Sequence, residues 1–315
     1  MIAFSAAIEP LRIANRFLPD PAYEWCLLSE DGNPVKASNN ILVNVDGSLD
    51  EIRRGLVGPN YPEMILICSG LMANKYVNNQ LSIWLRKMYA EGVLIGGMCT
   101  GAWVLAQTGL LANRRCAIHW EDMPTFSEAF PDIDAQASLF EIDGNITTCA
   151  GGTAALDMML NIIGRHVGVE IQTKVCEQVL IDQTRSATDR QRMPLWARLG
   201  IQNNKLLFII ELMEANLSEP LPLIELSHYT NLSRRQIERL FRKYLGRSPA
   251  RYYLDLRLER ARHLLLQSDM PIIEVAIACG FVSASHFSKC YREFCGHSPH
   301  ADRTNNLFKA GLSGP

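Results

Sequence analysis

The stretch "AIACGFVSASHFSKCYREFCGHSP" (276–299) repeats the pattern of "LSHYTNLSRRQIERLFRKYLGRSP" (226–249). The two copies align without a gap, so that Ser233 pairs with Ser283 and the two Gly-x-Ser-Pro endings coincide. Each copy has the pattern of a short helix, a turn and a serine-led second helix, because serine favours an N-cap and glycine followed by proline ends a helix. The repeat predicts two helix-turn-helix units in an all-α C-terminal domain.

The second helix of the first copy carries apolar residues at i, i+3, i+4 and i+7, which predicts a buried stripe of Ile237, Leu240, Phe241 and Tyr244. Basic side chains would then point outward, where they could contact phosphates or purine edges in a DNA major groove. The long amphipathic helix between the copies would place both second helices on successive groove faces. Solvated faces of a helical bundle are the alternative explanation.

The charge distribution supports a polyanionic partner. The net charge is −2, yet residues 1–202 carry 16 Lys and Arg against 22 Asp and Glu, whereas residues 203–303 carry 14 against 11. Within 233–262 the balance is 10 against 3. A basic block of this kind inside an acidic protein indicates a polyanion such as DNA.

The N-terminal half alternates short apolar strands with helical patterns. Strands are predicted at 64–68, 93–95, 116–118 and 145–149, and helices at 79–90 and after Thr153. This alternation predicts a doubly wound, mostly parallel, flavodoxin-like α/β sheet that binds ligands at the carboxyl ends of its strands. We expect domains at 1–181 and 205–303, a connector at 182–204 that packs partly around Leu195 and Trp196, and a tail at 304–315.

The composition argues against a membrane protein and against a protein stabilised by disulfides or zinc. No apolar run reaches 18 residues and no signal-peptide pattern begins the chain, so we expect a cytoplasmic protein without a membrane span. Its nine cysteines are scattered without a CxxC pair. This spacing argues against a disulfide framework or a structural zinc site, and we expect no metal and no cofactor.

The stretch "GGMCTGAW" (96–103) presents one cysteine where a strand turns into a helix. A helix N-terminus favours a thiolate. His119 and Glu9 complete the ingredients of a nucleophile with its base and orienting carboxylate, although the sequence does not show that they meet. Core packing is the alternative for Cys99 and His119, and a solvated position is the alternative for Glu9.

Residues 203–303 resemble the double helix-turn-helix domain of AraC/XylS-type transcription regulators. The family's long signature runs from Ala276 through Gly280-Phe281 and Tyr291-Arg292 to Ser298-Pro299. The resemblance implies double-stranded DNA, a small-molecule effector and RNA polymerase as partners, and a homodimer. It also implies DNA-binding positions at Ser233, Arg234, Arg235, Glu238 and Arg239 in the first copy, and at Ser283, Ala284, His286, Ser288 and Lys289 in the second.

Residues 1–180 resemble the class I glutamine amidotransferase-like fold of the ThiJ/PfpI group. The resemblance rests on Glu9, the Ser69-Gly70 turn, "GMCTGA", the spacing to His119 and "CAGGTAALD" (149–157). Joined to an AraC-type domain, this is the arrangement of GlxA-like regulators, in which the pocket senses a small molecule. The segments "SAAIEPLRIAN", "CAIHWEDM" and "GFVSASHFSKCYREF" are most similar to activators that respond to glycine betaine and dimethylglycine, with carnitine and arginine responders as close relatives.

The residue types are compatible with such a ligand. The rings of Trp103 and Trp120 could attract a quaternary ammonium group, and Glu9, Glu121 or Asp122 could add negative potential. Packing in the core is the alternative for both tryptophans. The predicted ligand-binding set is Glu9, Ser69, Gly70, Cys99, Thr100, Trp103, His119, Trp120 and Glu121.

The sequence departs from the family in one respect, because members usually begin with a strand whereas the helical pattern here follows Met1 directly. Either the true start lies upstream or the sheet lacks one strand. The sequence thus predicts a transcription regulator, an activator rather than an enzyme. Its rivals are a cysteine-dependent amidase or hydrolase with an appended DNA-binding domain, and a constitutive DNA-binding protein with a vestigial pocket.

Overall fold

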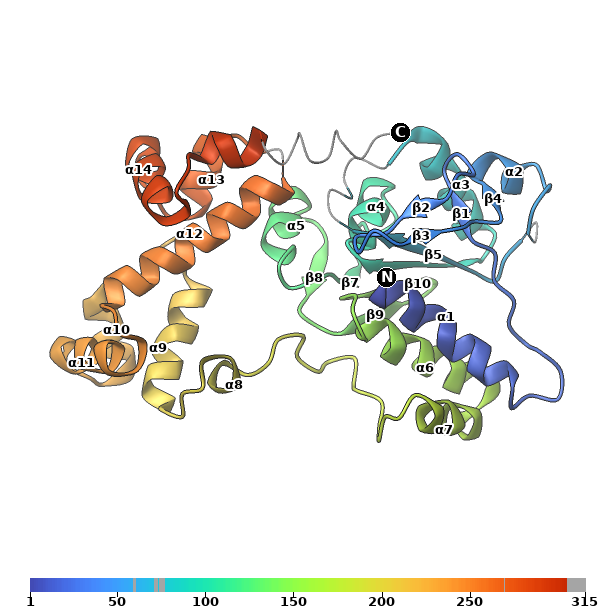
Figure 1. Cartoon of the computed structure of the whole chain (residues 1–315), viewed down its shortest axis with the longest axis horizontal. Helices are drawn as coiled ribbons and strands as arrows, with labels where there is room; N and C mark the ends of the chain where they lie inside the picture. Colours follow the sequence, from blue (N-terminus) through green and yellow to red (C-terminus); the bar gives the residue numbers. More distant parts are fainter. Residues whose placement is uncertain (59–60, 71–72, 74–76, 269, 305–315) are drawn as a thin grey trace. The chain divides into compact units, whose positions relative to one another are not determined.

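The computed structural model describes residues 1–58, 61–70, 73, 77–268 and 270–304 (Figure 1). The chain divides into two compact units, Met1–Arg192 and Met193–Pro315, called unit 1 and unit 2 below. The division falls inside the predicted connector at 182–204. Except for Thr304, the predicted tail lies outside the described residues.

Unit 1 is built on a four-stranded sheet in the order β5 (Met64–Ser69), β6 (Leu94–Cys99), β10 (Ile146–Cys149) and β9 (Phe140–Asp143). The first three strands are parallel and β9 is antiparallel. The predicted strand at 93–95 was too short, because β6 continues through Gly96 and Gly97 to Cys99. Pairing with both β5 and β10 extends it.

Helices cover both faces of this sheet, as expected for a doubly wound fold. On one face α3 (Asn79–Ala90) and α4 (Gly101–Gln107) pack over Ile95 and Ile146. On the other, α1 (Ile2–Asn15) and α6 (Ala154–Val167) pack over Met98 and Cys149, and α7 (Val169–Gln178) joins them (Figure 1). The flavodoxin-like α/β prediction is therefore confirmed.

Short elements complete unit 1. They are α2 (Leu49–Arg53), α5 (Met123–Ala129) and three pairs of strands: β1 (Leu28–Ser29) with β4 (Gly47–Ser48), β2 (Val35–Lys36) with β3 (Leu42–Val43), and β7 (Arg115–Ala117) with β8 (Asp134–Gln136). The backbone N–H of Ala117 donates to Oγ1 of Thr148 at 2.8 Å. This bond ties the end of β7 to β10, so the residues that follow β7 lie near the carboxyl ends of the central strands.

Unit 2 is helical: α8 (Leu195–Leu199), α9 (Asn204–Ala215), α10 (Leu223–Thr230), α11 (Arg234–Leu245), α12 (Pro249–Gln267), α13 (Ile272–Ala278) and α14 (Ala284–Cys295). The pairs α10–α11 and α13–α14 form the two helix-turn-helix units, each with its own core. This confirms the prediction from the repeat. Among the described residues, no helix in either unit is long and apolar enough to cross a membrane.

The predicted apolar stripe of α11 is one residue too long. Ile237 and Phe241 are fully buried, but Tyr244 is 38% exposed and Lys243 lies over its ring. Instead, the ring of Tyr252 on α12 packs against the ring of Phe241, with 5.6 Å between the two ring centroids. Of the two predicted connector anchors, Leu195 is buried in unit 2 whereas Trp196 is 55% exposed.

Helix α12 contacts both helix-turn-helix units, by ring packing of Tyr252 on Phe241 of α11 and by hydrogen bonds to the end of α13, and it is bonded to the segment before α10. Tyr253 Oη donates to the carbonyl of Asn216 at 2.6 Å and accepts from the N–H of Leu221 at 3.2 Å, which holds the segment before α10. One turn later, Arg257 donates to the carbonyls of Cys279 and Gly280 at 2.7 and 2.6 Å, at the end of α13. The long helix therefore fixes one unit relative to the other.

Candidate functional site

Cys99 sits on a strained elbow between β6 and α4. Its φ is +57°, a left-handed conformation that costs a non-glycine residue on the order of 1–3 kcal/mol. Two glycines leave the space that the elbow needs: a Cβ on Gly101 would lie 2.5 Å from the carbonyl oxygen of Ile67, and one on Gly151 would lie 2.6 Å from Cβ of Cys99. Gly101 of "GMCTGA" and Gly151 of "CAGGT" are therefore part of this geometry.

Three more predicted site residues meet at the elbow. The hydroxyl of Thr100 donates to the carbonyl of Gly70 at 2.6 Å. Its oxygen lies 3.0 Å from Oγ of Ser69, and because its single proton is already used, Ser69 is the donor of that bond. Cys99, Thr100, Ser69 and Gly70 thus lie together at the carboxyl ends of β5 and β6.

The electrostatics of the elbow oppose a thiolate. Burial, together with the nearby carboxylates of Asp122 and Glu121, raises the pKa of Cys99 to about 11, and the hydrogen bond from the backbone of Thr100 offsets these effects only in part. At pH 7 roughly one molecule in ten thousand would carry the thiolate. The expectation that the helix N-terminus favours a thiolate is therefore outweighed by burial and acidic neighbours.

The predicted base, His119, and the predicted orienting residue, Glu9, have different partners. Nδ1 of His119 lies 3.7 Å from Glu121 and 4.0 Å from Asp122. Glu9 is half-exposed and paired with Arg12 at 2.6 Å, and the hydrogen bond from Arg12 lowers the pKa of Glu9. His119 joins the acidic residues near the thiol, whereas the contacts of Glu9 are with its own helix.

The two tryptophans have different surroundings. Trp103 packs edge-on against Phe126 and Phe130 at 5.3 and 5.4 Å, within the core over one sheet face. These contacts favour the packing explanation for Trp103, whose side chain is half-buried. Trp120 follows β7, lies beside His119 at 5.5 Å between ring centroids, and holds the guanidinium of Arg192 at 4.0 Å from its own centroid.

Sequence reasoning missed Gln191 and Arg192 as parts of this site. Both lie in the predicted connector, yet Oε1 of Gln191 accepts the backbone N–H of Trp120 at 2.8 Å and Arg192 covers the Trp120 ring. A basic and amide-bearing sequence just before the second domain was the only available signal, and it does not identify a partner 71 residues away.

The predicted DNA-binding residues lie on the second helix of each helix-turn-helix unit or cap it. On α11 the side chains of Arg234, Arg235, Glu238 and Arg239 are exposed, and Arg235 and Arg239 lie on the face away from Ile237 and Phe241. On α14 His286 and Lys289 are exposed, whereas Ala284 and Ser288 are half-buried.

The two serines among these residues act as helix caps. Oγ of Ser233 accepts the N–H of Gln236 at 3.3 Å, and Oγ of Ser283 accepts the N–H of His286 at 3.1 Å. Each hydroxyl keeps its proton free for an outside acceptor. The first unit has the stronger positive face, since α11 carries five basic residues against Glu238.

No described group of three or more histidine, cysteine or acidic residues is arranged to hold a metal ion. All nine cysteines are free thiols. The chemistry that the described site offers is therefore a half-buried thiol, nearby carboxylates and an aromatic face. The second unit adds two helices with exposed basic side chains.

Comparisons with known proteins agree with both halves of the chain. Residues 8–165 match the "DJ-1/PfpI family" and residues 226–305 match the "Helix-turn-helix domain". Three HTH-type transcriptional regulators of Pseudomonas aeruginosa are similar over nearly the whole chain. GbdR is 45% identical over 96% of this chain and 81% of its own, CdhR 41% over 100% and 91%, and ArgR 38% over 96% and 89%. The chain therefore belongs to the family of DNA-binding transcription regulators that join a DJ-1/PfpI domain to an AraC-type helix-turn-helix domain.

Proposed function

We propose that this regulator is an activator that responds to a small nitrogenous metabolite bound in unit 1 near Cys99. Glycine betaine or dimethylglycine fits best, and carnitine or arginine are the alternatives. Binding in unit 1 must favour one arrangement of the protein over another, because a ligand with equal affinity for both arrangements would switch nothing.

The observation that carries this proposal is the cationic contact on Trp120. Its ring already holds a guanidinium at 4.0 Å, which shows that the face accepts a positive charge. The carboxylates of Glu121 and Asp122 lie close enough to Cys99 to raise the pKa of its thiol, so the surroundings are also negative. An aromatic face beside carboxylates is the chemistry that binds methylated and quaternary amines.

A thermal-shift series on the full chain tests the ligand class. At a ligand concentration 100 times Kd, we expect the melting temperature of unit 1 to rise by roughly 5–10 °C with glycine betaine or dimethylglycine. Carnitine, choline and arginine complete the series, and Trp120→Ala should remove the response while Trp103→Phe keeps it. If none of these amines shifts the parent protein, the constitutive DNA-binding alternative becomes the better explanation.

The rival function, a cysteine-dependent hydrolase, requires a reactive thiol. Because the pKa of Cys99 is raised to about 11, alkylation of this residue by iodoacetamide should be slow at pH 7 and should accelerate about tenfold per pH unit up to at least pH 10. Peptide mapping by mass spectrometry separates Cys99 from the other thiols. A rate that levels off near pH 7 would instead indicate a stabilised thiolate and revive the enzyme.

Three further expectations belong to this proposal. The protein would act in the cytoplasm, where its DNA is, form a homodimer through unit 1, and contact RNA polymerase once bound at a promoter. Their support is the resemblance to the regulator family and the presence of the DNA-binding domain. The sedimentation velocity of the full chain tests the dimer.

A further inference from the structure

The last residues of unit 1, 185–192, form a segment that we call the strap. Its first residue is anchored firmly, because Arg185 donates from Nε and Nη2 to the buried carboxylate of Asp157 at 3.0 and 2.6 Å. Farther along, the carbonyl of Ala187 accepts the N–H of Leu139 at 2.8 Å. The strap is therefore part of unit 1 and not a loose connector.

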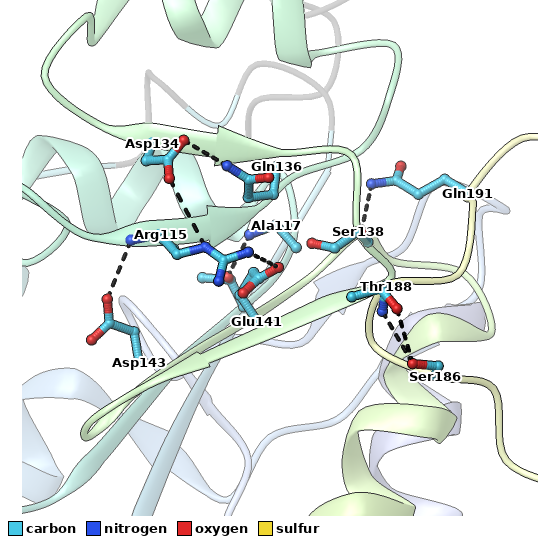
Figure 2. A network of polar contacts seen from close by, with 11 residues as sticks. Arg115, Ala117, Asp134, Gln136, Ser138, Glu141, Asp143, Ser186, Thr188 and Gln191 are labelled. Atoms are coloured by element: carbon cyan, nitrogen blue, oxygen red, sulfur yellow. Dashed lines mark hydrogen bonds and ion pairs between the residues drawn. The ribbon is translucent and has the colours of Figure 1, made fainter.

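Ion pairs and a hydrogen bond connect strands β7, β8 and β9, which lie next to the strap. Figure 2 shows Arg115 of β7 between Asp134 of β8 and Glu141 of β9, with N···O distances of 3.9 and 3.5 Å. The backbone N–H of Arg115 also donates to Asp143 at 3.2 Å. Polar contacts of Arg115 thus connect strands β7, β8 and β9 next to the strap.

Gln191 fastens the far end of the strap next to the candidate effector site. Its amide nitrogen donates to the carbonyl of Ser138 at 2.7 Å (Figure 2). The same nitrogen donates to the carbonyl of Ile118 at 2.9 Å, and the amide oxygen accepts the N–H of Trp120 at 2.8 Å. One side chain therefore joins the residues that follow β7 to those that precede β9. Trp120 contributes its backbone to this contact.

Arg192, the last residue of unit 1, covers the ring of the same tryptophan. Its guanidinium carbon lies 4.0 Å from the Trp120 centroid, and both side chains are half-buried. The next residue, Met193, is the first of unit 2. Trp120 thus holds the end of the strap twice, through its N–H to Gln191 and through its ring to Arg192.

We infer that the Trp120 ring face is a subsite for an organic cation, that Arg192 occupies it when the effector is absent, and that the effector displaces Arg192 and loosens the end of the strap. This inference rests on the proposed function, because it assigns the positive group of the effector to one surface. It also names Arg192 as an internal competitor.

The effector and Arg192 compete because the Trp120 ring face is small. One indole face holds one cation at contact distance, so a quaternary ammonium and the guanidinium exclude each other. The apparent affinity for the effector is then lowered by the fraction of molecules in which Arg192 is bound. A displaced Arg192 no longer holds the end of the strap to the Trp120 ring, and the covalent link to Met193 carries the change to the DNA-binding unit.

The experiment measures the binding of glycine betaine and of tetramethylammonium to the full-length protein by titration calorimetry. Arg192→Gln removes the competing charge at similar length and should bind betaine roughly 2- to 30-fold more tightly than the parent, as the strength of a cation–aromatic contact implies. Arg192→Lys keeps a cation and should stay near the parent. Arg190→Gln removes an exposed charge two residues earlier and controls for net charge.

Hydrogen exchange provides the second readout. The N–H of Trp120 should exchange faster in Arg192→Gln without ligand, and faster in the parent once betaine is bound. Equal betaine affinities of parent and Arg192→Gln would overturn this inference and leave the proposed ligand class standing. Tighter binding by Arg190→Gln to the same degree would also overturn it. If no amine binds either protein, the proposed ligand class fails as well.

Discussion

Arg239→Ala is expected to weaken the binding of a cognate operator roughly 5- to 150-fold, which corresponds to about 1–3 kcal/mol. Arg239 is exposed on the outward face of α11, on the opposite side from the buried Ile237 and Phe241. Removing its guanidinium therefore removes a contact to DNA without leaving a cavity in the core. A gel-shift titration at fixed salt measures the loss.

Two comparisons sharpen this result. Lys289→Ala on α14 should cost less, because the second unit is less basic than the first. Lys205→Ala removes an exposed charge at the start of α9 and should leave the affinity nearly unchanged. If Arg239→Ala and Lys205→Ala cause the same loss, binding depends on the net charge of unit 2 and not on α11. A salt slope lowered by about 1 would identify Arg239 as a phosphate contact.

Gly151→Ala should lower the free energy of unfolding of unit 1 by about 2–5 kcal/mol, since overpacking and backbone strain add. The new methyl group would lie 2.6 Å from Cβ of Cys99, and the φ of residue 151 is +89°. Urea unfolding followed by tryptophan fluorescence measures the change, because four of the five tryptophans lie in unit 1.

The adjacent glycine is the matched control. Gly152 also has a positive φ, +56°, but a Cβ there meets no atom within 4 Å. Gly152→Ala should therefore cost about 1 kcal/mol from the backbone alone. Cys99→Gly in the Gly151→Ala background should recover part of the loss. Equal losses at positions 151 and 152 would mean that the elbow contact contributes nothing.

Local patterns were enough to predict most of the fold. Alternating apolar runs identified β5 and β10, and the aligned serines and glycines located both helix-turn-helix units. The predictions that failed concerned features that depend on residues far away in the sequence. The extension of β6 to Cys99 comes from pairing with strands on both sides, and Tyr252 of α12, not the predicted Tyr244, packs its ring against Phe241.

The candidate site was predictable to the same degree. Ser69, Gly70, Cys99 and Thr100 meet because neighbouring parallel strands end at the same edge, which a sequence can indicate. The i, i+3 spacing of Glu9 and Arg12 was visible in the sequence. Whether Glu9 would pair with Arg12 or take part in the site around Cys99 could not be judged from sequence. The contacts of Gln191 and Arg192 with Trp120 depend on the path of the strap, which has no periodic pattern.

The bonds from Tyr253 and Arg257 of α12 have a consequence for affinity. Because one helix fixes both helix-turn-helix units, docking of the first on DNA leaves the second at a high effective concentration over its own groove. The loss of translational and rotational freedom is incurred once for both. We therefore expect even the weakly basic α14 to add nearly its full contact energy once α11 is docked.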